Sequence, residues 1–127
     1  MVYLDTNVII YLLEDHPDYG RQTAKKLADL KTEGQSFIAS TILATEFLAG
    51  STATSFNDLA RVTELTFEDV SLEIARSAAI HQQEHGLAMG DAIHLATATI
   101  LSQVSTFFTY DKQLADAAAK YLKVITA

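Results

Sequence analysis

Four acidic side chains stand where apolar runs of this sequence pass into expected loops or helix starts. They are far apart along the chain, and they are Asp5, Glu46, Asp91 and Asp111. If a compact fold gathers them, their charges repel one another unless a cation neutralises them. Hard divalent cations prefer oxygen ligands and are the natural candidates. The pattern therefore predicts metal-dependent phosphate chemistry.

The elements that must position these acids alternate between strands and helices. Apolar runs predict strands at 1–4, 36–39, 64–67, 106–109 and 123–126. Helical patterns lie between them, at 7–13 with Thr6 as N-cap, at 19–31, at 42–50 after Ser40 or Thr41, at 58–61 after a loop over 51–57, and at 69–85, 91–102 and 112–120. This alternation predicts one α/β domain over residues 1–127, with a mostly parallel sheet of about five strands and helices on both faces.

In a sheet of this kind, ligands bind outside the carboxyl ends of the strands. Asp5 directly follows the first expected strand, and Asp111 follows the fourth with Tyr110 between them. Glu46 and Asp91 would reach the same edge from helices. The topology thus predicts that the four acids share one rim.

Composition limits the class of protein. The chain has 127 residues, of which 49% are hydrophobic and 20% charged, as in an ordinary globular domain. It has no cysteine, which excludes disulfides and thiolate metal sites. No apolar run reaches the roughly 18 residues of a membrane span, and no basic residue precedes the apolar N-terminus as in a signal peptide. We expect a cytoplasmic protein without a membrane segment.

The net charge of −7 argues against a broad electrostatic surface for nucleic acid. It does not exclude an enzyme that acts on nucleic acid. Bound divalent cations would supply positive charge locally, at the point where a phosphate lies.

The run from Val2 to Asn7, VYLDTN, leads a strand into one carboxylate with a hydroxyl and an amide beside it. Together with Glu46, the GDA start of a helix at 90–92 and the FFTYD strand end at 107–111, it resembles the PIN-domain nucleases. The nearest resemblance is to VapC-like toxins of type II toxin–antitoxin systems. It covers essentially the whole chain, and the acids occur in the same order.

This resemblance implies a PIN-like three-layer fold and a metal-dependent endoribonuclease that hydrolyses RNA phosphodiester bonds. Asp5 would be the central metal ligand, Glu46 and Asp91 would complete the site, and Asp111 would be a fourth acid that often acts through water. The cofactor would be Mg²⁺ or Mn²⁺. Whether one or two ions bind stays open.

The resemblance also implies roles for neighbouring residues. Thr6, Asn7 and Thr109 would orient carboxylates and water. Lys112, adjacent to Asp111, is a candidate phosphate contact, and His94, three residues after Asp91, is a candidate substrate contact. The implied partners are the RNA substrate, a cognate antitoxin that wraps a groove near the helix over 21–31, and a second copy of the chain in a homodimer.

Each acid also has an ordinary structural interpretation. Asp5 could accept hydrogen bonds from a helix start, Asp91 could be an N-cap, and Asp111 could begin a capped helix after a turn. Glu46 resists this interpretation because it lies within an apolar helical segment, where an unpaired buried charge is costly.

Other functional classes fit less of the sequence. His81, Glu84 and His85 match the HxxEH pattern of inverted zinc peptidases, but no glutamate follows to provide the third ligand. A receiver domain needs paired acids after the first strand, and a haloacid-type phosphatase needs an acid where Asn7 stands. A PIN-like module that binds a partner without catalysis stays open as the alternative.

Overall fold

The computed structural model describes residues 1–50, 58 and 65–126. Within them, five strands form one parallel sheet in the order β3-β2-β1-β4-β5. The strands are β1 (Val2–Leu4), β2 (Phe37–Ser40), β3 (Leu65–Glu68), β4 (Thr106–Phe108) and β5 (Lys123–Ile125). The expected parallel sheet is confirmed.

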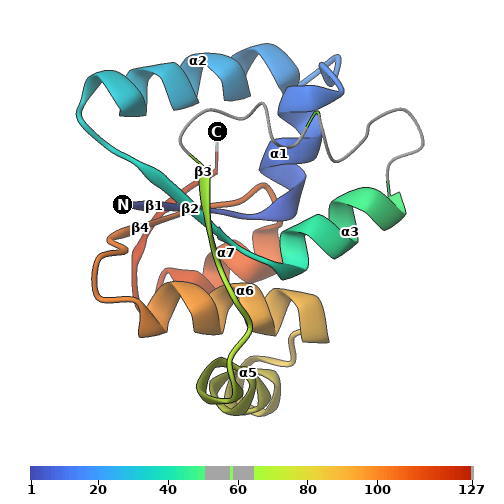
Figure 1. Cartoon of the computed structure of the whole chain (residues 1–127), viewed down its shortest axis with the longest axis vertical. Coiled ribbons are helices and arrows are strands. Elements are labelled where there is room, and N and C mark those ends of the chain that lie inside the picture. The colour runs from blue at the N-terminus through green and yellow to red at the C-terminus, as the bar shows by residue number, and fades with distance from the viewer. Residues whose placement is uncertain (51–57, 59–64, 127) are drawn as a thin grey trace.

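The described helices are α1 (Thr6–Leu13), α2 (Gly20–Thr32), α3 (Ile42–Gly50), α5 (Leu72–His85), α6 (Met89–Ile100) and α7 (Lys112–Ala118). Figure 1 shows α1 and α2 on one face of the sheet and α5 and α6 beyond the other. The sheet is therefore the middle of three layers. The predicted α/β fold with helices on both faces is confirmed.

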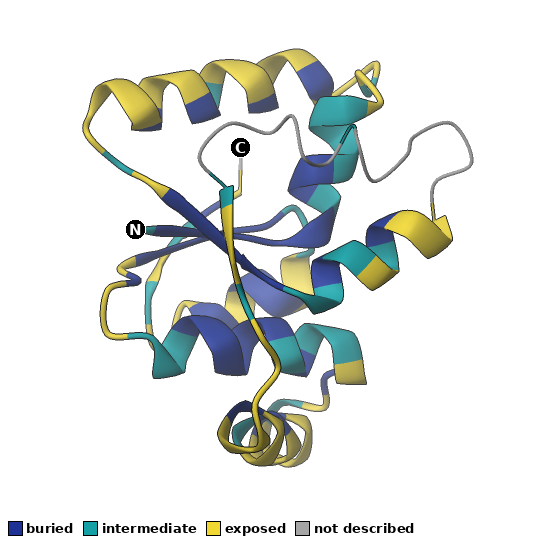
Figure 2. Ribbon diagram, viewed as in Figure 1, coloured by how far each residue is buried: buried dark blue, intermediate teal, exposed yellow. Residues whose placement is uncertain are grey.

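Strand alternation divides the core into two apolar clusters, because successive side chains of a strand point to opposite faces. Val2 and Leu4 pack with Val8 and Leu27 on the side of α1 and α2. Tyr3 points the other way and packs with residues of α5, α6 and α7. The three central strands are consequently buried along their whole length (Figure 2).

The order in which strands are added to the sheet reverses at β1, and this reversal determines where Asp5 lies. The strand β2 pairs with β1 on one side, and β4, which comes later in the chain, pairs with β1 on the other side. Leu4 is paired with Phe108, and the Asp5 amide donates to the Phe108 carbonyl at 3.0 Å. Open α/β sheets bind ligands at such a switch point, beyond the carboxyl ends of the strands. Asp5 and Thr109 leave the sheet there, side by side.

Three predicted helix starts need correction. The N-cap of α1 is Asp5 and not Thr6, because the Asp5 backbone is extended and its side chain accepts the Thr6 amide. Helix α5 begins at Leu72 and not at 69, since Ser71 is its N-cap. Helix α6 begins two residues before Asp91, after Ala88, so Asp91 lies in its first turn.

Part of the prediction cannot be compared with the structure. The expected loop over 51–57, and residues 59–61 of the expected short helix, lie outside the described residues, as does residue 64. In the remainder of the chain, no helix has both the length and the apolar character that crossing a membrane demands.

Helix α5 presents an imidazole to the core. His81 is 6% exposed, and its Nδ1 is buried without a hydrogen-bond partner. The His81 ring stacks on that of His85 at 5.6 Å between centroids, and Nε2 of His85 lies 2.8 Å from the Tyr121 hydroxyl. Burial lowers the pKa of His81, the nearby His85 lowers it further, and Glu84 opposes this only in part. His81 is therefore packed as a neutral ring.

We expect this ring to reduce stability in acid. In the unfolded chain His81 has an ordinary pKa near 6.5, so below about pH 6.5 the unfolded state binds a proton that the folded state resists. Lowering the pH from 7.5 to 5.5 should therefore reduce the free energy of unfolding of the native protein relative to that of His81→Leu. Urea unfolding at both pH values measures this difference. Equal pH dependence of the two proteins would contradict the expectation.

Candidate active site

Asp5 lies at the switch point and is held by two donors. Its side chain is almost completely buried, with 4% of the residue exposed. Oδ1 accepts the Thr6 amide at 2.8 Å, and Oδ2 accepts the Thr109 hydroxyl at 2.7 Å. Both oxygens are thereby oriented. Burial raises the pKa of Asp5, and this outweighs the lowering effects of His94 and of the two hydrogen bonds.

Glu46 reaches Asp5 from the middle of α3. Its Oε1 accepts the Thr6 hydroxyl at 2.7 Å and lies 2.6 Å from Nε2 of His94. The same nitrogen is 3.5 Å from Oδ1 of Asp5. Two carboxylates that are distant in sequence therefore converge on one imidazole nitrogen and one threonine. This contact explains how an acid is accommodated in an otherwise apolar helix.

His94 is completely buried, which does not suit the predicted contact with substrate. It serves instead as a bridge inside the protein. Burial lowers the pKa of His94, but the hydrogen bond to Glu46 and the charges of Asp5, Glu46 and Asp91 raise it, and the net shift is upward. For Glu46 the effects are reversed. Burial raises its pKa, whereas the hydrogen bonds from His94 and Thr6 lower it, and the net shift is downward.

Asp91 faces the other acids from the first turn of α6. Burial raises its pKa, the charges of Asp5 and Asp111 raise it further, and the result is a pKa of about 6. A carboxyl group at a helix N-terminus ordinarily gains from the helix dipole. The upward shift therefore reflects burial of the Asp91 carboxyl group first and the charges of nearby acids second. Asp91 is thus close enough to Asp5, Asp111 and Glu46 to be affected by their charges.

Asp111 lies at this rim and also caps a helix. Its Oδ1 accepts the Leu114 amide at 3.0 Å, as the N-cap of α7. Its own amide donates to the Thr109 hydroxyl at 3.0 Å, so Thr109 contacts both Asp5 and Asp111. The structural interpretation of Asp111 therefore holds alongside its place among the acids.

Asn7 and Lys112 occupy the margin of the rim. The Asn7 side-chain oxygen accepts the Tyr110 amide at 3.2 Å, so Asn7 holds the backbone just before Asp111 and not a carboxylate. Lys112 is exposed at the first position of α7, next to Asp111. Among the described residues, His94 is the only base within ion-pair distance of Asp5 or Glu46.

The donor set fits a hard divalent cation in its chemistry. The four acids offer only oxygen atoms, and the raised pKa of Asp91 shows that further negative charge is disfavoured there. In the described part of the chain, however, no three carboxylate or imidazole groups are placed to hold an ion as they stand. Asp91 and Asp111 are only half-buried, whereas Asp5 is almost completely buried.

Sequence reasoning missed two residues of this site. The sequence pattern predicts Tyr3 only as part of a strand, whereas its hydroxyl lies 2.6 Å from Nδ1 of His94. The pattern predicts Gly90 only as part of a helix start, whereas Glu46 Oε2 lies against it. Strand alternation from Asp5 could have placed Tyr3 on the face that α6 covers, but the contact with Glu46 across Gly90 had no sequence signal.

A family model described as the PIN domain matches residues 2–120. A search among curated proteins finds no match.

Similar solved structures extend over nearly the whole chain. A toxin–antitoxin complex from Klebsiella pneumoniae has a TM-score of 0.72 at 23% identity, and the match covers 99% of this chain and 97% of the other. VapBC2 from Rickettsia felis, bound to a DNA fragment from its promoter, has a TM-score of 0.70 at 18% identity, with 98% of each chain covered. FitAcB from Neisseria gonorrhoeae has a TM-score of 0.67 at 22% identity, with 98% and 96% covered. At these identities the likeness concerns the fold.

The crowding of acids predicts that removing one charge stabilises the metal-free protein. At pH 7, Asp91→Asn should increase the free energy of unfolding by about 1–2 kcal/mol, after allowance for solvent screening of this half-buried group. Because the pKa is raised from 3.8 to about 6, the destabilisation by Asp91 is absent below about pH 4, grows between pH 4 and 6, and is complete above about pH 6. Chemical denaturation at pH 7 and pH 4 measures both values.

Asp116→Asn is the matched control, since Asp116 is an exposed acid on α7. It should change stability by less than about 0.5 kcal/mol. Added Mn²⁺ should raise the melting temperature of the native protein more than that of Asp91→Asn. Destabilisation by Asp91→Asn at pH 7 would show that the acids do not repel one another.

Proposed function

This chain belongs to the PIN-domain family, and from that premise we propose that it is a metal-dependent endoribonuclease, the toxin of a toxin–antitoxin pair. One observation supports the proposal above the others. Asp5 and Glu46 converge at the switch point of the sheet, beside Asp91, whose pKa is raised to about 6 by burial and by the surrounding acids. A structural role alone gives no reason to concentrate negative charge in this way.

Asp5, Glu46, Asp91 and Asp111 are the residues that would hold Mg²⁺ or Mn²⁺. A bound ion would supply a Lewis acid that lowers the pKa of water and offsets the charge that develops on phosphate. Thr6 and Thr109 keep the carboxylate of Asp5 in one orientation before any ligand arrives. Lys112 is exposed next to Asp111, and its ammonium group would contact a phosphate of the substrate.

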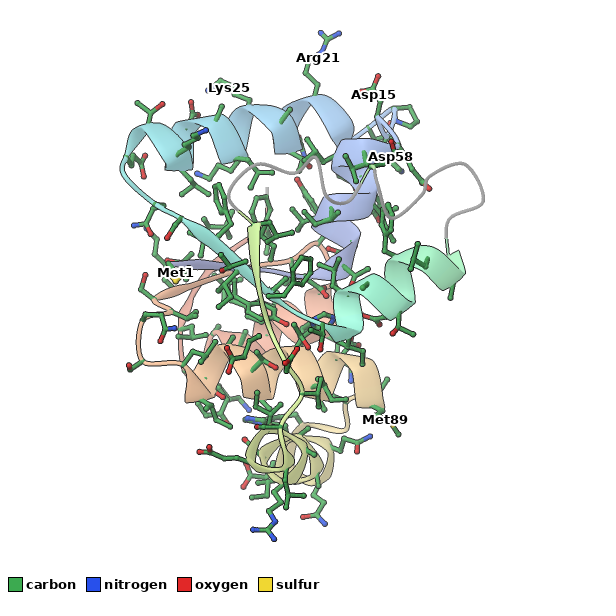
Figure 3. The ribbon with its side chains drawn as sticks, in the orientation of Figure 1. Met1, Asp15, Arg21, Lys25, Asp58 and Met89 are labelled. Carbon is green, nitrogen blue, oxygen red and sulfur yellow. The ribbon has the colours of Figure 1, made fainter. Side chains whose placement is uncertain are left out.

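Partners follow from the same proposal. The Klebsiella pneumoniae structure is a toxin–antitoxin complex, which supports a cognate antitoxin for this chain. Figure 3 shows Arg21 and Lys25 projecting from the outer side of α2, and Lys25 pairs there with Asp29 at 2.8 Å. We assign the antitoxin to the α2 side of the molecule. We also propose that the chain forms a homodimer and acts in the cytoplasm.

The alternative is a PIN-like module that binds a partner without catalysis. The observation in its favour is that Asp5 and Asp111 are both N-caps, so each acid has a structural use without any metal. Cleavage itself distinguishes the two functions, because the binding module has no metal-dependent activity on RNA.

Asp5→Asn is the decisive variant. Asparagine caps a helix about as well as aspartate, so the fold should remain, whereas the loss of charge should reduce cleavage at least about 100-fold. Single-stranded RNA and DNA oligonucleotides of one sequence, with Mn²⁺ or with EDTA, measure activity and substrate class together. RNA should be cut and DNA spared, and EDTA should abolish cleavage.

Asp116→Asn serves again as the control and should keep full activity, because this acid lies on the exposed side of α7. Failure of the native protein to cut RNA with Mn²⁺ would favour the binding module. Undiminished cleavage by Asp5→Asn would remove Asp5 from the catalytic set.

A further inference from the structure

We propose that Tyr3, His94 and Gly90 are positioning residues that hold the Glu46 carboxylate in a slot. Buried hydrogen bonds through Tyr3 and His94 form one side of the slot, and Gly90, which has no side chain, forms the other. The inference rests on the proposed function, because a fixed Glu46 matters most if the carboxylate is a metal ligand. None of the three residues needs to touch the ion or the RNA.

The chain of hydrogen bonds begins in the sheet. Tyr3 is completely buried, and its hydroxyl accepts the Ser40 amide at 3.1 Å, across from β1 to the end of β2. The Tyr3 ring is stacked on Phe107 of β4, with centroids 5.1 Å apart and planes inclined by 13°. Three neighbouring strands thus fix the phenol in place.

From the sheet the chain crosses to α6. The Tyr3 hydroxyl lies 2.6 Å from Nδ1 of His94, and Nε2 of the same ring lies 2.6 Å from Oε1 of Glu46. A hydroxyl group can donate or accept, so it pairs with Nδ1 whether the imidazole is neutral or charged. The ring position therefore does not depend on its protonation. His94 acts as a rigid spacer between the phenol and Glu46.

Gly90 forms the opposite wall of the slot. A Cβ atom at this position would lie 2.8 Å from Oε2 of Glu46, which is closer than real Cβ contacts. The carboxylate is the mobile end of a flexible side chain, so an added methyl group would displace Glu46 and leave the helix in place. Gly90 thus lets Glu46 lie directly over the first turn of α6, beside Asp91.

Together these contacts give the two oxygens of Glu46 different surroundings. Oε1 is held by His94 and Thr6, and Oε2 lies against Gly90. Partners that orient metal ligands commonly affect metal affinity 10–100-fold when they are removed. Tyr3 acts one step further away, through His94, so its loss should have an effect near the lower end of that range.

Tyr3→Phe tests the chain because it deletes one hydroxyl and keeps the stacked ring. Calorimetric titration with Mn²⁺, in the absence of RNA, should show affinity about tenfold weaker than in the native protein. Ile74→Ala is the control for lost stability, since Ile74 is a buried residue of α5 in the same apolar cluster as Tyr3. It should lower the melting temperature and leave Mn²⁺ affinity unchanged.

Gly90→Ala tests the slot from the other side. Alanine favours a helix over glycine, so the melting temperature should rise or stay level while Mn²⁺ affinity falls. Gly50→Ala at the end of α3 is the matched control, because a Cβ there would meet no atom of the described residues within 4 Å. Its Mn²⁺ affinity should equal that of the native protein.

The results separate this inference from the proposed function. Unchanged Mn²⁺ affinity in Tyr3→Phe and Gly90→Ala would overturn the inference, while cleavage by the native protein would still support the ribonuclease. If the native protein binds no Mn²⁺, the proposed function fails, and a double-mutant cycle of Tyr3→Phe with Glu46→Ala decides the inference alone. Non-additive losses of stability would support the positioning chain, and additive losses would refute it.

Discussion

Repulsion among acids at one edge of a parallel sheet is the constraint on which this structure depends. Burial and neighbouring carboxylates raise the pKa of Asp91 to about 6, so the folded chain holds these charges together at a cost. The surrounding elements limit that cost with individual hydrogen bonds. Thr6, Thr109 and His94 each contact at least one of the acids, and each comes from a different element or connection. The side chains at the rim are thus held in place by the hydrogen bonds that their charged carboxylates accept.

The strand β1 positions several of the side chains on which the rim depends. Because side chains of a strand alternate between faces, Tyr3 enters the layer of α5 and α6 while Leu4 enters the layer of α1 and α2. The residue after Leu4 is Asp5, which leaves the sheet at the switch point. One three-residue strand therefore anchors both layers and the first acid, and a shift of its register by one residue would reverse all three placements.

Much of the fold could be predicted from sequence, because alternating apolar runs and helical patterns are local signals. The strands and the described helices lie within a few residues of their predicted positions, and the acids at 5 and 111 follow strands as expected. The caps were less predictable: whether Asp5 or Thr6 begins α1 depends on backbone angles that neither residue type decides. The burial of His94 depended on Tyr3 and Glu46, which are distant in sequence, so no local pattern could reveal it.

The double use of Asp5 and Asp111 as acids and as helix caps has an evolutionary consequence. A cap needs only a short side chain with an acceptor oxygen, and asparagine satisfies that need as well as aspartate does. A single base change in either codon converts one into the other. The scaffold can therefore lose these charges without losing its architecture, so under the proposed function an inactive form of the protein lies one mutational step away.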